Sequence, residues 1–236
     1  IGLMGAKEIL SEDEISFIIR TASNRGAYIS YKTGKGSDEP YEINSTWWSA
    51  INDEKAPEDL TAKVKRFIAS RSISLVLKGV PGIYIHGAIG SENDHGGVRH
   101  TGIKRDVNRS IINADTVERD FRDPDSKFSL ICRYSERMFI IRTCSRAFHP
   151  RGRQKVLYLS PFIFALLRTS PEEDESILTL TNVTGRKVLL NISLEEIGID
   201  TGGWTDLTGD LRCEARDGIL DISMDAYDVK WLRPDK

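Results

Sequence analysis

Apolar positions in the first 142 residues recur at the three- and four-residue spacing of amphipathic helices. The run Ser11-Glu12-Asp13-Glu14 has the form of a capping box, and a helix is predicted from it up to Gly26. A second helix is predicted from Pro57 toward Leu75, because Pro suits a first helical turn. Two further helices are predicted over 115–122 and 129–142. The apolar positions that define these helical faces are Ile15, Ile18, Ile19, Ala22, Leu60, Val64, Phe67, Ile68, Leu130, Tyr134, Met138 and Ile141.

Two stretches between these helices lack the helical spacing. The run 82–86 is apolar, β-branched and bounded by Gly and Pro, which predicts a strand buried on both faces, as in a parallel sheet. It is followed by a polar, glycine-rich loop over 87–113. Residues 28–52 collect turn residues and predict a long functional loop. These turn residues are Gly34, Gly36, Ser37, Asp38 and Pro40.

The pattern changes near residue 148 to short alternating apolar runs, which predict strands. The predicted strands are 156–159, 163–168, 177–181, 187–191, 218–222 and 229–232. Turn signals such as Thr184-Gly185 and Asp217-Gly218 separate them. This pattern favours a small antiparallel β-sandwich. We therefore predict two modules, residues 1–148 and 149–236.

Composition excludes several classes of function. The 33 Lys+Arg and 35 Asp+Glu give a formal net charge of −2, so no nucleic acid or anionic membrane partner is expected. No apolar stretch has the length of a membrane span. The three cysteines have no metal-ligand spacing, which indicates reduced thiols in a cytoplasmic protein. This near-neutral composition favours small neutral partners over nucleic acid or anionic membranes.

The loop over 87–109 holds the candidate chemistry. Its polar side chains, among them Asn93, Asp94 and Arg105, can make many directional hydrogen bonds to hydroxyl groups. An arginine paired with a carboxylate is held planar and rigid, which favours binding to a sugar ring. The alternative is that this arginine only stabilises the loop. A metal site built from the histidines and acids of this loop is disfavoured, since their spacing matches no closed zinc pattern. Trp47, Trp48, Trp204 and Trp231 are expected to pack in cores, with sugar stacking as the alternative.

Several segments resemble sucrose phosphorylase-like enzymes of the alpha-amylase superfamily, glycoside hydrolase family 13. The run Lys104-Arg105-Asp106-Val107-Asn108-Arg109 resembles the family's Gly-Arg-Asp-Ile-Asn-Arg, and residues 79–87 resemble its eighth barrel strand. Tyr41-Glu42-Ile43-Asn44-Ser45-Thr46 resembles Tyr-Gln-Val-Asn-Ser-Thr. Runs such as Gly203-Trp204-Thr205-Asp206-Leu207 resemble the C-terminal domain of the same enzymes. The departures are Lys104 in place of glycine and Glu42 in place of glutamine.

This resemblance implies the C-terminal part of a (β/α)8 TIM barrel followed by an antiparallel β-sandwich. It implies that Arg105 contacts a bound glucosyl unit and that Tyr41 and Glu42 line the acceptor side. Asn93 and Asp94 are further substrate-binding candidates because they belong to the hydrogen-bonding side chains of the loop. A carboxylate at Glu42 would repel incoming phosphate unless a nearby cation compensates.

The implied activity is that of an α-glucoside phosphorylase of the sucrose or glucosylglycerate type. Such an enzyme transfers glucose to inorganic phosphate with retention and needs no cofactor or metal. The resemblance places the catalytic carboxylates in an N-terminal part that precedes Ile1, so no catalytic residue is assigned here. The alternatives are an α-glucosidase or transglucosidase of the same superfamily and a non-catalytic carbohydrate-binding module.

Overall fold

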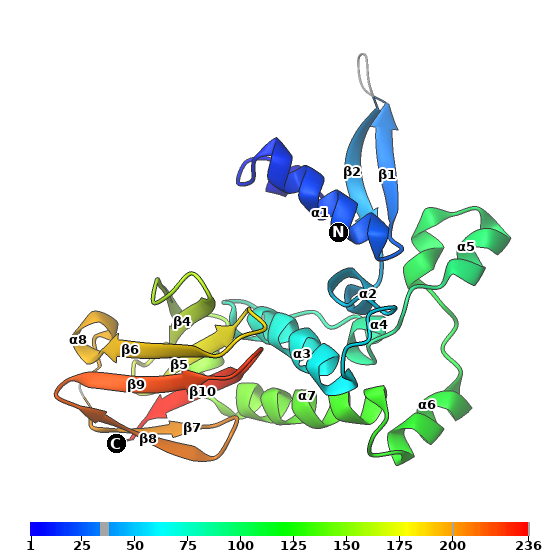
Figure 1. The fold of residues 1–236 in the computed structure, drawn as a ribbon. Helices are drawn as coiled ribbons and strands as arrows, with labels where there is room; N and C mark the ends of the chain where they lie inside the picture. Colours follow the sequence, from blue (N-terminus) through cyan, green and yellow to red (C-terminus); the bar gives the residue numbers. More distant parts are fainter. Residues whose placement is uncertain (34–37, 200, 236) are drawn as a thin grey trace. The chain divides into compact units, whose positions relative to one another are not determined.

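The computed structural model describes residues 1–33, 38–199 and 201–235, which form two compact units (Figure 1). The first unit contains residues 1–59 and 83–131, and the second contains residues 60–82 and the chain from residue 132 onward. None of the described helices has the length and apolarity needed to cross a membrane.

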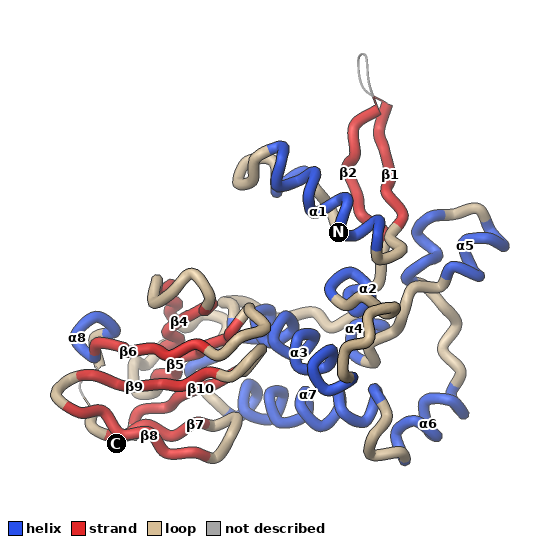
Figure 2. Tube along the Cα trace, viewed as in Figure 1, coloured by secondary structure: helices blue, strands red, loops and turns tan. Residues whose placement is uncertain are grey.

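The first unit is built from short helices and one pair of strands, coloured by type in Figure 2. Its elements are η1 (Met4–Ala6), α1 (Glu12–Asn24), β1 (Tyr28–Thr33), β2 (Asp38–Asn44), α2 (Trp47–Ile51), α4 (Ile85–Ala88), α5 (His95–Thr101), η2 (Lys104–Asn108), α6 (Ala114–Arg122) and the start of α7 (Lys127–Cys144). The predicted helices over 115–122 and 129–142 are confirmed as α6 and α7.

The predicted capping box at the start of α1 is confirmed. The backbone N–H of Glu14 donates to Ser11 Oγ at 3.3 Å, and the backbone N–H of Ser11 donates to Glu14 Oε2 at 2.8 Å. These hydrogen bonds hold the pKa of Glu14 below its ordinary value. Ala22 of α1 packs with Leu3, Ile29 and Ile43 in a small apolar cluster against the strand pair.

The prediction of one long loop over 28–52 is wrong. Strands β1 and β2 pair antiparallel, from Tyr28 opposite Asn44 to Thr33 opposite Asp38, and α2 follows. The β-branched and aromatic residues of this segment suit a pleated pair, although its turn residues suggested a loop. Gly34, Gly36 and Ser37 lie outside the described residues. The register shifts between Ser30 and Tyr31, which leaves Tyr41 as the extra residue of a bulge.

The strand predicted over 82–86 is also absent. The backbone has no regular structure up to Tyr84, and α4 begins at Ile85. Ile83, Tyr84 and Ile85 are exposed, and only His86 is buried. A parallel strand needs hydrogen-bonded neighbours, and the described residues offer this run no adjacent strand.

Among its described residues, the second unit combines several helices with a sheet of eight antiparallel strands. Its elements are α3 (Leu60–Val76), the remainder of α7, η3 (Arg146–Phe148), β3 (Arg153–Leu157), β4 (Ile163–Thr169), β5 (Ser176–Asn182), β6 (Val188–Ser193), α8 (Leu194–Ile197), β7 (Gly203–Asp206), β8 (Leu211–Arg216), β9 (Ile219–Met224) and β10 (Val229–Pro234). Helix α3 confirms the helix predicted toward Leu75, but it begins at Leu60 and not at Pro57.

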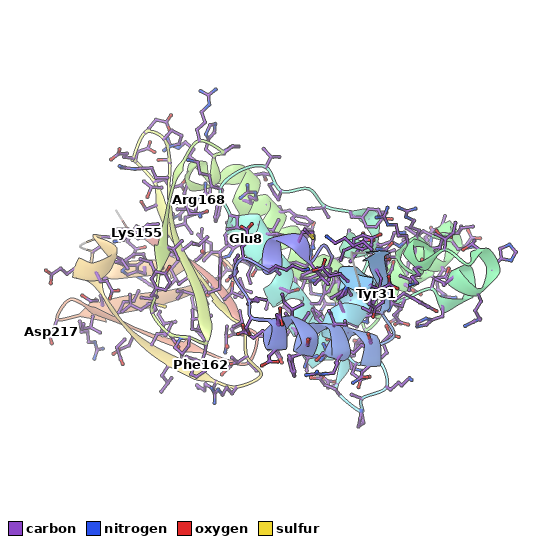
Figure 3. The ribbon with its side chains drawn as sticks, turned by 90° about the horizontal axis from the view of Figure 1, so that it is seen from above. Glu8, Tyr31, Lys155, Phe162, Arg168 and Asp217 are labelled. Carbon is purple, nitrogen blue, oxygen red and sulfur yellow. The ribbon has the colours of Figure 1, made fainter. Side chains whose placement is uncertain are left out.

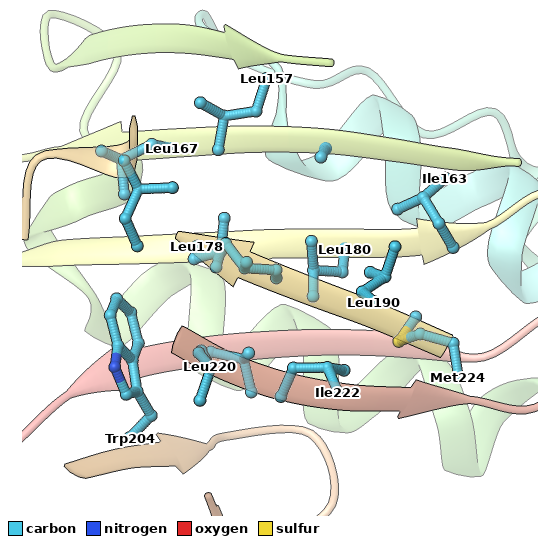
Figure 4. Close-up of a cluster of buried hydrophobic side chains, with 14 of the residues drawn as sticks. Leu157, Ile163, Leu167, Leu178, Leu180, Leu190, Trp204, Leu220, Ile222 and Met224 are labelled. Carbon is cyan, nitrogen blue, oxygen red and sulfur yellow. The ribbon is translucent and has the colours of Figure 1, made fainter. Parts of the chain in front are cut away.

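The predicted antiparallel sandwich is confirmed. The strand order is β3-β4-β5-β10-β7-β8-β9-β6. Strand β8 pairs with β7 through residues up to Glu214 and with β9 through Ala215 and Arg216, so it passes from one layer to the other. Apolar side chains of both layers meet in one buried cluster (Figure 4). Strands β7 and β8 were not predicted, because β7 is short and β8 is mostly exposed and polar.

Arg168 on β4, labelled in Figure 3, is fully buried and joins the sheet to α3. Its guanidinium donates to the carbonyl oxygens of Val76 at 2.7 Å, His149 at 3.0 Å and Arg153 at 3.2 Å. Burial, with a contribution from Arg142, lowers the pKa of Arg168 to about 10. Trp204 and Trp231 are also fully buried, which favours their expected core-packing role.

Candidate functional site

The predicted substrate residues Arg105 and Glu42 lie against each other in the first unit. Arg105 projects from η2, and its Nε and Nη2 donate to Glu42 Oε2 at 3.1 Å and Oε1 at 3.3 Å. Such a two-pronged pair fixes the plane of the guanidinium. The Arg105 side chain remains 52% exposed and that of Glu42 22% exposed. The pair therefore presents a rigid, accessible cation beside a carboxylate.

The electrostatics of Arg105 follow from this geometry. The hydrogen bond to Glu42, together with the negative charge of that carboxylate, raises the pKa of Arg105 above its ordinary value. A smaller contribution to the raised pKa comes from the Tyr41 side chain. Because Tyr41 precedes Glu42 in the bulge of β2, three predicted substrate residues contribute to one local cluster. We refer to Tyr41, Glu42 and Arg105 as the Arg105 cluster.

Lys104 and Asn108 anchor η2 to the strand pair. The ammonium of Lys104 donates to the carbonyl oxygen of Ile29 at 2.7 Å and lies 5.7 Å from the centre of the Tyr31 ring. Asn108 Nδ2 donates to the Ser45 carbonyl oxygen at 3.4 Å. Lys104, which replaces the glycine of the family motif, thus ties the segment carrying Arg105 to β1. From the sequence, Lys104 could be identified only as a departure from the family motif. Its role could not be predicted, because its partner Ile29 lies 75 residues away.

Asn93 fastens the end of β2 to the loop that follows α4. Its Oδ1 accepts from the backbone N–H of Thr46 at 2.7 Å and from the Ser45 hydroxyl at 3.1 Å. Its Nδ2 donates to the carbonyl oxygen of Gly26 at 3.3 Å. The Asn93 amide therefore binds the protein itself in this structure and positions the strand that carries Glu42.

Asp94 lies beside Asn93 and caps α5. Its Oδ1 accepts from the backbone N–H of Gly97 at 2.8 Å. The backbone N–H of Asp94 donates to the Val107 carbonyl oxygen at 2.8 Å, which connects this loop to η2. Asp94 thus contributes to the scaffold around Arg105, although its carboxylate is not part of the Arg105 cluster.

His95 is held against the base of the strand pair. Its Nδ1 lies 3.2 Å from the Tyr28 hydroxyl, a contact that sequence reasoning missed. Gly26 has a φ of +86°, and a Cβ there would lie 2.9 Å from His95 Nε2. Glycine is therefore required at this position, both for its backbone conformation and for the close approach of His95.

His86 and Glu92 contact residues outside the Arg105 cluster. His86 Nδ1 lies 2.9 Å from Ser91 Oγ, and burial lowers the pKa of His86. Glu92 pairs with Lys127 at 2.7 Å. Within the described ranges, no three His, Cys, Asp or Glu side chains gather closely enough to hold a metal ion.

Comparison with solved structures identifies the class of fold. An alpha-amylase from Geobacillus thermoleovorans has a TM-score of 0.61 at 15% identity, over 82% of this chain and 37% of that chain. A sucrose 6F-phosphate phosphorylase from Thermoanaerobacter thermosaccharolyticum also has a TM-score of 0.61, at 19% identity, over 78% of this chain and 34% of that chain. No protein-family model matches the chain. The fold is that of part of an alpha-amylase superfamily enzyme.

Sequence relatives narrow this class. The chain is 37% identical to a glucosylglycerate phosphorylase of Spirochaeta thermophila, over 99% of this chain and 40% of the relative. It is 32% identical to a glucosylglycerate phosphorylase of Allomeiothermus silvanus, over 94% of this chain and 39% of the relative. A sucrose phosphorylase of Streptococcus mutans is 26% identical over 66% of this chain and 30% of the relative. The chain belongs to the sucrose phosphorylase-like enzymes and spans about two fifths of the length of the two glucosylglycerate phosphorylases.

Proposed function

We propose that the protein containing this chain is an α-glucoside phosphorylase with glucosylglycerate as its donor. The Arg105–Glu42 pair carries the proposal, because it places a cation beside the carboxylate that would otherwise repel phosphate. Two glucosylglycerate phosphorylases match at least 94% of this chain, whereas the sucrose phosphorylase from Streptococcus mutans matches 66%. This difference in coverage favours glucosylglycerate over sucrose.

The proposed reaction is a double displacement at the anomeric carbon. A carboxylate nucleophile displaces the glycerate oxygen while a carboxylic acid protonates it, and a phosphate oxygen then displaces the nucleophile. The product is α-glucose 1-phosphate with retained configuration. The two carboxylates are assigned to an N-terminal part of the same protein. Arg105 would bind the glucosyl unit, and Tyr41 and Glu42 would border the acceptor.

Asn93 and Asp94 complete the proposed site. Their hydrogen bonds to Thr46 and Gly97 support a role in shaping the substrate-binding loop. In the whole protein, residues 1–148 would belong to the TIM barrel and residues 149–236 to the β-sandwich.

The protein would be cytoplasmic, and its reaction would need no cofactor.

Exposed apolar side chains of the first unit support packing against a further part of the barrel. Phe17 is 63% exposed, Phe121 62% and Ile111 97%. Apolar groups that face solvent in this number indicate a surface that another segment covers. We assign that segment to the N-terminal part of the same enzyme.

A donor panel with and without phosphate tests the proposal. Full-length protein is incubated with glucosylglycerate, sucrose, sucrose 6′-phosphate and glucosylglycerol, and α-glucose 1-phosphate is measured. We expect phosphate-dependent product with glucosylglycerate as the best donor. Glucose release without phosphate would instead identify a hydrolase, the second candidate, which the likeness to alpha-amylases favours. No reaction with any donor would leave the non-catalytic carbohydrate-binding module.

A further inference from the structure

A hollow of about 390 Å³ lies entirely within the second unit. Residues of α3, α7, the β7–β8 turn and the segment that leads into β10 line it. This volume lies within the range of sites that bind small molecules. Neither the Arg105 cluster nor the proposed reaction uses any residue of the hollow.

Basic side chains outnumber acidic ones in the lining. The basic residues are Lys65, Arg133, Arg137 and Lys230, and the acidic residues are Asp206 and Asp228. This excess favours an anionic ligand.

Internal contacts already engage some of these charges. Arg137 pairs with Asp210, and its Nε donates to the Leu207 carbonyl oxygen at 2.8 Å. Asp206 is buried, accepts from the hydroxyl of Thr208 at 2.6 Å, and lies 3.5 Å from the ammonium of Lys230. These contacts fix the wall formed by the β7–β8 turn.

Lys65 on α3 differs from these residues. It lies on the wall of the hollow, and no ion pair or hydrogen bond joins its ammonium to the part of the chain that the structure describes. The Lys65 ammonium is therefore available to an anion. Lys230, whose ammonium lies 3.5 Å from Asp206 Oδ2, can supply a second cationic donor.

The remaining lining suits the ring and hydroxyl groups of a sugar. Met138 and Ile68 form a buried apolar floor, and the Tyr134 ring is partly exposed beside them. Tyr227 has a φ of +58°, and its hydroxyl accepts from Arg66 Nε at 3.0 Å, which fixes its ring. A lining that combines an aromatic ring with cations is a suitable surface for a phosphorylated sugar.

We propose that this hollow binds a small sugar monophosphate. The phosphate would be held by Lys65 and Lys230, and the sugar would lie against Tyr134 with its hydroxyls toward Asp228. The proposal does not depend on the proposed function, since its site shares no residue with the Arg105 cluster.

Calorimetric titration of the full-length protein tests the proposal, with glucose 6-phosphate, inorganic phosphate and glucose as separate probes. We expect glucose 6-phosphate to bind at least about tenfold more tightly than either of its parts, because both halves of the ligand contribute. Lys65→Ala should weaken glucose 6-phosphate binding about tenfold, through loss of a charge-assisted hydrogen bond. Inorganic phosphate that binds with equal affinity and loses this binding in Lys65→Ala would contradict a sugar site.

Two control variants distinguish binding in the hollow from binding elsewhere on the protein. Lys78→Ala removes an exposed lysine of the same unit that lies outside the lining, and it should leave affinity unchanged. Arg105→Ala should also leave glucose 6-phosphate binding unchanged, whereas a loss there would place the ligand at the Arg105 cluster. Thermal unfolding of Lys65→Ala should match that of Lys78→Ala. Equal affinities of Lys65→Ala and Lys78→Ala would overturn the proposal.

Discussion

The two units of the chain stabilise themselves in different ways. The second unit encloses a broad apolar cluster to which both layers of the sandwich contribute (Figure 4). The first unit contains a smaller apolar cluster around Leu3, Ala22, Ile29 and Ile43. The loops of its proposed site are held by hydrogen bonds that Asn93 and Asp94 accept and that Lys104 donates. The second unit is therefore held largely by apolar packing, and the loops that carry the proposed site are held by hydrogen bonds.

The largest expected effect is on activity and comes from the first unit. Arg105→Ala should lower kcat/KM of the full-length enzyme for phosphorolysis by at least about a hundredfold, because the glucosyl unit loses its positioning clamp. Steady-state kinetics measures this loss. Arg99→Ala removes an exposed arginine of α5 in the same unit and serves as the control. Near-normal rates for Arg105→Ala would remove Arg105 from the site.

The largest expected effect on stability lies in the second unit. Arg168→Met removes the buried donor of three carbonyl oxygens, among them that of the buried Val76, and should lower the free energy of unfolding by about 3 kcal/mol. Urea denaturation measures the change. Arg153→Met breaks only the exposed pair with Glu173 and should cost less than about 1 kcal/mol. Similar losses for the two variants would contradict a special role for the buried guanidinium.

A moderate effect is expected at the proposed acceptor side. Glu42→Gln removes the carboxylate that pairs with Arg105, so the pKa of Arg105 should fall toward its ordinary value while the group stays charged. The unpaired guanidinium should lower KM for phosphate about threefold to tenfold. Initial rates at varied phosphate concentrations give this value. Glu39→Gln changes a neighbouring carboxylate of β2 that pairs with Lys7 and Lys32, and it should leave KM for phosphate unchanged.

The smallest effect is expected at the start of α1. Ser11→Ala removes the side-chain cap and should lower the free energy of unfolding by about 1 kcal/mol without changing kcat. Thermal denaturation and an activity assay measure both outcomes. Ser11→Asp, which can still accept the Glu14 N–H, should restore most of the loss; a failure to do so would argue against capping as the cause.

Local patterns predicted much of this fold. Helices α1, α6 and α7 and six sandwich strands follow from apolar spacing and caps that operate within a few residues. The hairpin of β1 and β2 was missed, because its turn residues outweighed the pairing preference of Tyr28, Ile29 and Tyr31. The strand predicted over 82–86 does not form. Its residues have strand preference, but a buried parallel strand also needs neighbouring strands, which the local sequence does not supply.

The sequence indicated which residues are candidates for the site, but it did not indicate the contacts between them. The family resemblance indicated Arg105, Tyr41 and Glu42, and Coulomb repulsion required a cation near Glu42. The identity of that cation depends on a contact across 63 residues. The bond from Thr46 to Asn93 spans 47 residues and joins two loops. Spacing along the chain carries no information about such approaches.

A double-mutant cycle on Arg105 and Glu42 tests most directly the claim that the two residues act as one unit on the substrate. The measured quantity is kcat/KM for phosphorolysis of glucosylglycerate by the full-length enzyme and by Arg105→Ala, Glu42→Gln and the double variant. We predict that Glu42→Gln changes the rate of the parent enzyme but has almost no further effect once Arg105 is absent. Effects of the two substitutions that simply add would contradict the account.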